Sequence, residues 1–303
     1  MNELPIMQTK ESSTPASKTG FSLRRSSAIS GILHSRRAQV GFGIITFFIV
    51  LAVAAPVVVP YSPYAFPPPG QPYSPPSYRF PLGTDYVGED ILSELIYGGR
   101  VSITVGVVVA LLSTTFGTII GIVSGYYMRT IDEILMRLTD VVLILPSLPL
   151  MIILAAYLGP SLQTVILVLT FTAWPSVARV VRSQTLSLRE RPFVDSARVA
   201  GASDLRIITK VLLPNLASII AANAVLITEI AIGGEAALDF IGLGDISLVS
   251  WGTMLYWAQS YAPFHGAWWW VIAPGLCIVI VGLGFVLISV SIENVFNPKL
   301  RSV

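Results

Sequence analysis

The sequence predicts an all-α integral membrane protein with six transmembrane helices. Three observations support this fold class: 53% of the residues are hydrophobic, 12% are charged, and long uncharged runs alternate with short segments that hold the charges. Soluble domains carry roughly 25% charged residues. The mean hydropathy of +0.73 agrees with a membrane protein. The composition therefore excludes a soluble enzyme.

The uncharged runs set the number of crossings. Val40 to Val59 is about 30 Å long as a helix and crosses the hydrocarbon core once, so we place the first transmembrane helix at residues 40–60. The run from 141 to 178 is too long for one helix and is divided at Gly159-Pro160. The other crossings are expected within Val101–Met128, Asn215–Phe240 and Val271–Ile292.

The distribution of Lys and Arg sets the orientation. With the N-terminus inside, the inner segments hold 17 of the 19 Lys and Arg residues, and Arg79 and Arg100 fall outside. The positive-inside rule then predicts a multi-pass protein of the cytoplasmic membrane with both termini in the cytoplasm. Residues 1–39 form a basic, Ser/Thr-rich cytoplasmic tail that we expect to be partly disordered. The net charge of +2 is too small to indicate a nucleic-acid partner.

The predicted outer segments are rich in proline and aromatic residues. Pro60 to Phe80 contains eight prolines, which favours an extended connection over a helix. We therefore assign 61–100 to an extracellular proline-rich segment with an amphipathic lead-in, and 101–303 to a core membrane domain that holds the other five crossings and the 188–215 loop. The aromatic residues near the other outer segments are predicted interfacial anchors: Trp251, Trp257, Tyr261, Trp268, Trp269 and Trp270.

Residues 188–215 form a charged loop between the fourth and fifth crossings. Pro192 suits the first turn of a short helix, and Gly201 can end that helix in a left-handed conformation. Ser203 can cap a second helix, which Pro214 disturbs. The pattern predicts a small, rigid knob, with one face of little side-chain bulk formed by Ala197, Ala200 and Gly201.

The sequence of this loop resembles the EAA loop of the membrane subunits of ABC importers. Asp195-Ser196-Ala197-x-x-x-Gly201 is followed by Val211-Leu212-Leu213-Pro214-Asn215. Asp195 stands where the family usually has Glu, and Ser196 where it usually has Ala. The resemblance implies docking in a groove of an ATPase subunit, whereas the alternative is an ordinary solvated loop. The coupling residues would be Val194, Asp195, Ser196, Ala197, Arg198, Gly201 and Ala202.

A second motif resembles the second permease subunit of dipeptide and oligopeptide importers, a family with nickel and oligosaccharide relatives. It reads Pro81-Leu82-Gly83-Thr84-Asp85-x-x-Gly88-x-Asp90. Glu89 and Glu94 stand where that family commonly has Arg, which makes this outer segment more acidic. The resemblance runs from about Val40 to Arg301 and implies the type I ABC importer permease fold.

Ionisable residues inside membrane helices are costly and indicate function by default. Asp140, Glu229 and Glu235 are therefore candidates for a translocation path or gate. The run from Glu235 to Gly244 resembles the family's E-A-S-L-S-F-L-G-L-G, and Asp140 with Pro146 fits its D-x-x-x-x-x-P segment. Glu229 matches no family position. A structural hydrogen bond between helices is the alternative for Glu235, and a neutral, hydrogen-bonded carboxyl is the alternative for Glu229.

The resemblance implies a permease subunit that moves peptides, or else oligosaccharides, into the cytoplasm by alternating access. Its partners would be a homologous second permease in a heterodimer, two ATPase subunits, an extracellular solute-binding protein and the lipid bilayer. No Gly-Lys pair occurs, so the chain has no P-loop and is not expected to be an enzyme. We expect no cofactor or metal in this chain, and ATP with Mg in the ATPase subunits. A proton-coupled secondary transporter using Glu229 and Glu235 is the alternative.

Overall fold

The computed structural model describes residues 35–64 and 66–296, and within these ranges it contains helices and no β-strand. The predicted disordered tail lies outside the described residues as far as residue 34. The helices are α2 (Arg36–Val58), α3 (Ile91–Tyr127), α4 (Arg129–Ile144), α5 (Ser147–Leu158), α6 (Leu162–Arg189), α7 (Pro192–Val199), α8 (Asp204–Ile207), α9 (Leu213–Phe240), α10 (Trp251–His265) and α11 (Trp268–Phe296).

The expected set of membrane-spanning helices is present, with one difference. Five described helices are long and apolar enough to cross a membrane, and α4 with α5 makes a sixth crossing if the pair forms one span. The predicted single third helix is wrong, because α4 and α5 meet at an angle of 89°. Pro146 lies between them and holds the preceding Leu145 in an extended conformation, with ψ at 132°.

The end of the predicted outer lead-in is continuous with the second crossing. Residues 91–127 form one continuous helix of 37 residues, α3. The glycines at 98 and 99, which look like a break in the sequence, lie against the start of α10 instead. A Cβ on Gly98 would stand 3.1 Å from the carbonyl carbon of Ser250. These glycines therefore serve close packing and not a turn.

The fifth crossing begins earlier than its apolar run. Pro214 does not end the predicted second loop helix, because α8 continues through a π-helical turn, Ile208–Leu212, into α9. Pro214 then occupies the first turn of α9, and its missing N–H is accommodated next to the wider π turn. The span accordingly runs without interruption from Asp204 to Phe240.

Three glycines of α3 spaced four residues apart, at positions 117, 121 and 125, pack tightly on α6. A Cβ on Gly117 would lie 2.6 Å from Cβ of Val177, and one on Gly125 would lie 2.8 Å from Cβ of Thr185. A Cβ on Gly121, between them, would lie 2.6 Å from the carbonyl oxygen of Ala178. Small residues at this spacing let two backbones approach closely in lipid. This glycine seam makes α3 and α6 a rigid pair.

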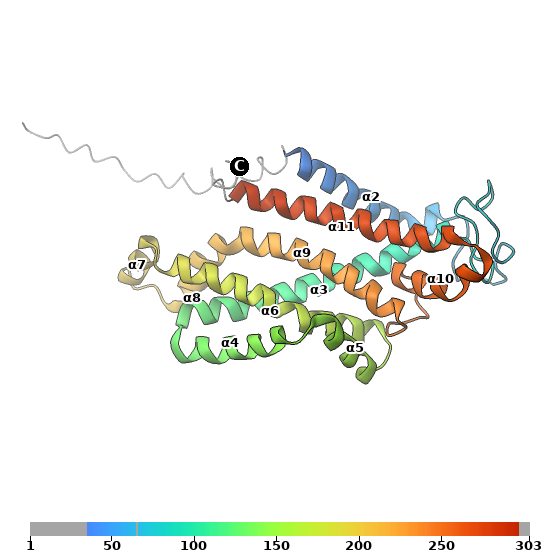
Figure 1. Ribbon diagram of the computed structural model, residues 1–303. Helices are drawn as coiled ribbons and strands as arrows, with labels where there is room; N and C mark the ends of the chain where they lie inside the picture. Colours follow the sequence, from blue (N-terminus) through green and yellow to red (C-terminus); the bar gives the residue numbers. More distant parts are fainter. Residues whose placement is uncertain (1–34, 65, 297–303) are drawn as a thin grey trace, which may run out of the picture.

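The two ends of the bundle carry different structures (Figure 1). At the end we call the α7 end, the short helix α7 projects beyond the long helices. At the opposite end, the α10 end, residues 59–90 fold beside α10 without forming a helix, as their prolines predict. Tyr73 from this segment stacks on His265 at 3.7 Å between ring centroids. The outer segment is therefore held on the bundle.

The predicted interfacial tryptophans divide into two groups. Trp268 is 63% exposed and fits an anchor position. Trp251 and Trp270 are each 1% exposed, so for them the prediction of an interfacial anchor is wrong. Trp251 donates its ring N–H to the carbonyl oxygen of Leu95 at 2.9 Å. These two rings form the core of the α10 end.

Candidate functional site

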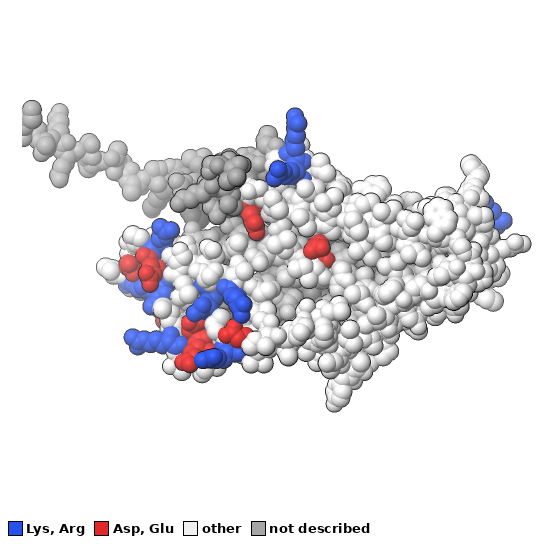
Figure 2. Space-filling view, viewed as in Figure 1, with Lys and Arg blue, Asp and Glu red and all other residues white. Residues whose placement is uncertain are grey.

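Charged side chains gather at the α7 end. Figure 2 shows Lys, Arg, Asp and Glu clustered there on the face in view, whereas most of the remaining surface is uncharged. The carboxylates and guanidinium groups pair with one another: Arg198 lies 3.0 Å from Asp195, and Arg179 lies 2.7 Å from Asp140. A dense set of exposed charges on a membrane protein marks the part that meets water and soluble partners.

Helix α7 places the predicted coupling residues on a small knob. Val194 is completely buried, and it fixes the knob to the hydrophobic core shared with α3 and α6. Val199, at the last turn, is 90% exposed, and Phe193 is 44% exposed. The helix therefore has one anchored side and one open apolar side, which is a surface that a second protein could cover.

Gly201 ends α7 in the predicted left-handed conformation, with φ at +78°. Its N–H donates to the carbonyl oxygen of Arg198 at 2.9 Å, and the N–H of Ala202 donates to that of Ala197 at 3.0 Å. This pair of bonds is the Schellman arrangement of a helix end. The prediction of one small-residue face is wrong, because α7 ends at Val199, and Ala200 and Gly201 lie beyond it.

Tyr126, near the end of α3, holds the knob from below. Its hydroxyl donates to Oδ1 of Asp204 at 2.7 Å. The guanidinium carbons of Arg198 and Arg189 lie 5.8 Å and 6.0 Å from the centre of its ring. Tyr126 thus contacts both ends of the loop around α7. Sequence reasoning missed it, since no local pattern reveals a partner 78 residues away.

A second cluster that the sequence did not reveal is a set of polar side chains that joins α3, α4 and α6. Asp132 of α4 accepts two hydrogen bonds from Arg182 of α6, both at 2.5 Å. The Ser124 hydroxyl of α3 donates to the same carboxylate. The Arg182 and Asp132 side chains are 30% and 17% exposed. Asp140, predicted for a path or gate, forms an exposed ion pair with Arg179.

Glu235 lies near the opposite end of α9, in the interior. It is 1% exposed, and the Ser102 hydroxyl donates to its two oxygens at 3.2 and 3.1 Å. The backbone N–H of Trp251 donates to the same Ser102 oxygen at 3.2 Å. Glu229 is not part of this site, because six residues along a helix place it about 120° around the helix axis from Glu235. It lies instead beside Gly282 of α11.

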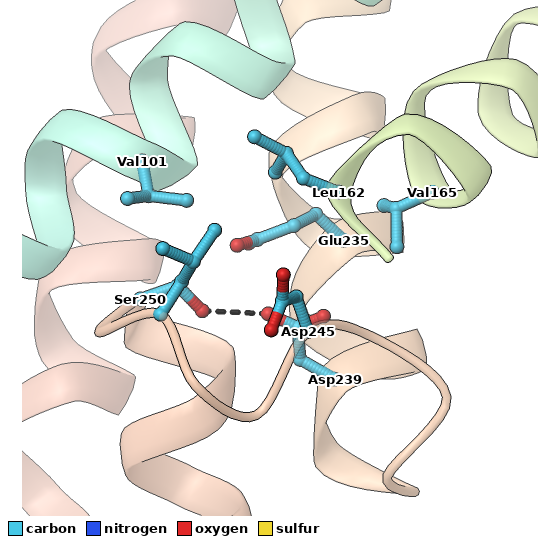
Figure 3. Close-up of a pocket in the computed structure, with 8 residues that line it drawn as sticks. Val101, Leu162, Val165, Glu235, Asp239, Asp245 and Ser250 are labelled. Carbon is cyan, nitrogen blue, oxygen red and sulfur yellow. Dashed lines mark hydrogen bonds between the residues drawn. The ribbon is translucent and has the colours of Figure 1, made fainter. Parts of the chain in front are cut away.

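Glu235 borders a small pocket that contains two further acids. Figure 3 shows Glu235, Asp239 and Asp245 beside Ser250, whose hydroxyl donates to Asp239 at 2.6 Å. Asp239 is 4% exposed. The pocket is lined by Val101, Leu162, Val165, Glu235, Asp239, Asp245, Leu248 and Ser250. Asp239 is not a predicted site residue, because its burial depends on the segment that follows α9 folding back to place Ser250 beside it.

The outer motif also gathers carboxyl groups. Asp85 is 1% exposed, and burial raises its pKa to about 6, although backbone N–H donors pull it down. Burial, followed by the charge of Asp85, raises the pKa of Glu89 to about 7. Both departures from ordinary carboxyl pKa values come from acids packed together away from water.

Comparison with known proteins gives consistent matches along the chain. Residues 117–302 match the family of binding-protein-dependent transport system inner membrane components, and residues 27–76 match the N-terminal transmembrane domain of oligopeptide transport permease C. The chain is 36% identical over 293 residues to a putative peptide transport system permease protein of Brucella suis, covering 94% of this chain and 98% of the relative.

Two further relatives and one solved structure are similar. The dipeptide transport system permease protein DppC of Alkalihalophilus pseudofirmus is 37% identical, over 91% of this chain and 90% of its own. The oligopeptide transport system permease protein OppC of Bacillus subtilis is 35% identical, over 88% and 87%. A chain of the inward-facing MetNI methionine ABC transporter shares the fold, with a TM-score of 0.51 at 19% identity, covering 66% of this chain and 97% of its own.

Proposed function

Because the chain belongs to the family of binding-protein-dependent transport system inner membrane components, we propose that it is the permease subunit of an ATP-driven importer of peptides. The three relatives described above are all named as peptide, dipeptide or oligopeptide permeases, which favours peptides over oligosaccharides as cargo. The importer would consist of this chain, a homologous second permease, two ATPase subunits and an extracellular binding protein. ATP and Mg would bind to the ATPases.

The observation that carries this proposal is the seating of α7. The knob is exposed at the charged end, yet Val194 is buried and Arg198 lies over the ring of Tyr126. Two residues separate it from α6, and α8 leads directly into α9. A force on α7 therefore reaches three spans at once: α6 and α9 through the backbone, and α3 through Tyr126.

The mechanism we propose is alternating access driven through this knob. When the ATPases close on ATP, α7 moves with them, and α6 and α9 tilt as rigid rods. The glycine seam between α3 and α6 makes those helices move together. Glu235, bonded to Ser102 of α3, is best explained as a structural link between α9 and α3 and not as a contact for solute.

Gly201→Val tests the proposal. Valine at a φ of +78° costs about 1–3 kcal/mol, so the end of α7 should deform. A Cβ at this position meets nothing within 4 Å, and any effect therefore comes from the backbone. In proteoliposomes with all subunits, we expect normal membrane insertion but loss of ATP hydrolysis stimulated by the loaded binding protein.

Two control variants sharpen this experiment. Gly159→Val introduces the same kind of strain at the other end, where φ is +87° and a Cβ also meets nothing, and it should keep stimulated hydrolysis. Asparagine tolerates the left-handed conformation, so Gly201→Asn should retain most of the stimulated ATP hydrolysis. Normal stimulation in Gly201→Val would refute the coupling role. Uptake by the isolated chain under a proton gradient without ATP would support the secondary transporter instead.

A further inference from the structure

Three carboxyl groups meet at the α10 end, where the outer segment joins α3. One carboxylate oxygen each from Asp85, Glu89 and Glu94 lies within 4.8 Å of the other two. Asp85 and Glu94 are buried and Glu89 is half-buried. The positive-inside rule places this end outside the cell.

The local backbone is built to bring these groups together. Oδ1 of Asp85 accepts the backbone N–H groups of Val87, Gly88 and Glu89 at 3.0, 2.8 and 2.7 Å. This turn folds Glu89 back over Asp85, and it requires Gly88, whose φ is +98° and whose added Cβ would stand 2.3 Å from the carbonyl oxygen of Gly70. Asp90 then caps α3, so that Glu94 faces the turn from the first turn of the helix.

An independent observation is that one carboxylate oxygen of this cluster, on Glu94, has no hydrogen-bond partner among the described residues. Glu94 is 8% exposed, and its buried Oε2 accepts no hydrogen bond from any described residue. The arginines that flank this region are engaged elsewhere: Arg79 donates to the carbonyl oxygen of Pro69, and Arg100 lies over the ring of Tyr97. A buried carboxylate without a hydrogen-bond donor or counter-charge destabilises the folded protein, so a positively charged partner at Glu94 would be stabilising.

We propose that Asp85, Glu89 and Glu94 bind a calcium ion on the extracellular side. The donors are all carboxylate oxygens, which hard divalent cations prefer. Two ligands of one Ca²⁺ stand at most about 5 Å apart, so three oxygens within 4.8 Å of one another can coordinate a single calcium ion. Mg²⁺ demands a near-ideal octahedron and dehydrates reluctantly, which favours calcium at this site. Water and backbone carbonyls would complete the coordination. Extracellular calcium modules bind with a Kd of about 10⁻⁴ to 10⁻³ M.

The ion would fasten the outer segment to the membrane bundle. Asp85 and Glu89 belong to the segment that precedes α3, whereas Glu94 is part of α3. Tyr86, next to Asp85, stacks on Trp257 at 5.3 Å, on Tyr261 at 4.7 Å and on Trp270 at 5.7 Å. A cation at the carboxylates therefore secures the aromatic layer that joins the outer segment to α10 and α11.

Terbium luminescence on the purified, assembled importer tests this site. Tb³⁺ replaces Ca²⁺ in oxygen sites, and the nearby tryptophans would sensitise its emission. We expect saturable emission from the wild-type protein that millimolar Ca²⁺ displaces and equal Mg²⁺ does not. Glu94→Gln and Glu89→Gln should each weaken binding about tenfold or more, since calcium affinity follows ligand charge. Glu89 is less buried than Glu94, so Glu89→Gln is the less disruptive change. If Glu94→Gln does not fold, the binding measured for Glu89→Gln tests the proposal.

Glu133→Gln is the matched control, because it removes one carboxylate from an exposed site on α4, at the α7 end. It should leave Tb³⁺ binding unchanged. Equal emission in Glu89→Gln and wild type would show an adventitious ion only and would overturn the proposal. So would the absence of a saturable signal, which would leave a proton shared by Glu89 and Glu94 as the explanation. The measurement needs neither nucleotide nor transport, so its failure would not touch the proposed permease function.

Discussion

The two ends of this molecule stabilise their carboxylates in opposite ways. At the α7 end, Asp132, Asp140 and Asp195 each pair with an arginine, at 2.5, 2.7 and 3.0 Å. At the α10 end, no ion pair is found among the described residues for Asp85 or Glu94, and both are buried. Most Lys and Arg residues lie in the predicted inner segments. Counter-charges for carboxylates are therefore plentiful at the α7 end and scarce at the α10 end.

This difference indicates that the two ends of the molecule have different roles. Paired, exposed charges at the α7 end cost little to keep in water, and they surround a helix whose outer side stays open. Unpaired, buried acids at the α10 end are destabilising unless a proton or a cation joins them. The α7 end is therefore suited to docking a soluble partner, whereas the stability of the α10 end depends on the pH and the cations of the solution around it.

The largest expected effect is a pH dependence at the α10 end. Burial raises the pKa of Asp85 from 3.8 to about 6, so between these values the folded protein binds more protons than the unfolded chain. Stability should then decrease as pH rises through this window, by about 3 kcal/mol for a shift of two pKa units. With calcium chelated, we expect the melting temperature of the importer to be lower at pH 8 than at pH 5.

Two comparisons test the cause of this effect. Asp85→Asn keeps an oxygen to accept the backbone N–H groups but cannot ionise, so its melting temperature should change less with pH. Added Ca²⁺ should raise the melting temperature at pH 8 more than at pH 5. A melting temperature that rises with pH in the chelated wild type would contradict the assignment.

The next effect concerns the half-buried ion pair between Arg182 and Asp132 at the α7 end. Arg182→Ala removes both hydrogen bonds to Asp132, whose side chain is 17% exposed, and should cost about 2 kcal/mol. Arg179→Ala breaks the pair with Asp140, whose side chains are 57% and 46% exposed, and should cost less than about 0.5 kcal/mol. Thermal unfolding of the two variants measures the difference. Equal losses would mean that burial does not decide the strength of these pairs.

The sequence predicted the features that depend on short stretches of chain. Uncharged runs indicated the crossings, and Gly201 indicated the end of α7. Features that depend on contacts between residues far apart in the sequence were not predicted. The approach of α10 to α3 buried Trp251, which looked interfacial, and joined residues 91–127 into one helix.

The candidate site divides in the same way. The predicted coupling residues stand out by their motif, but Asp132 and Arg182 lie 50 residues apart, and no local pattern links them. Asp85 and Glu94 are close in sequence, yet their meeting depends on the turn at Gly88. Spacing along the chain thus identified acidic residues without showing which of them would be left unpaired.

The smallest expected effect lies at Tyr126, which connects the knob to α3. Tyr126→Phe keeps the ring beneath Arg198 and Arg189 but removes the hydrogen bond to Asp204. Its loss should cost about 1 kcal/mol of stability. Stimulated ATP hydrolysis should fall partly, since α7 keeps its other anchor at Val194. Tyr127→Phe is the control, because that neighbouring side chain is 43% exposed. If both variants hydrolyse ATP like the wild type, the hydroxyl of Tyr126 takes no part in coupling, and the backbone connections to α6 and α9 carry the motion of the knob alone.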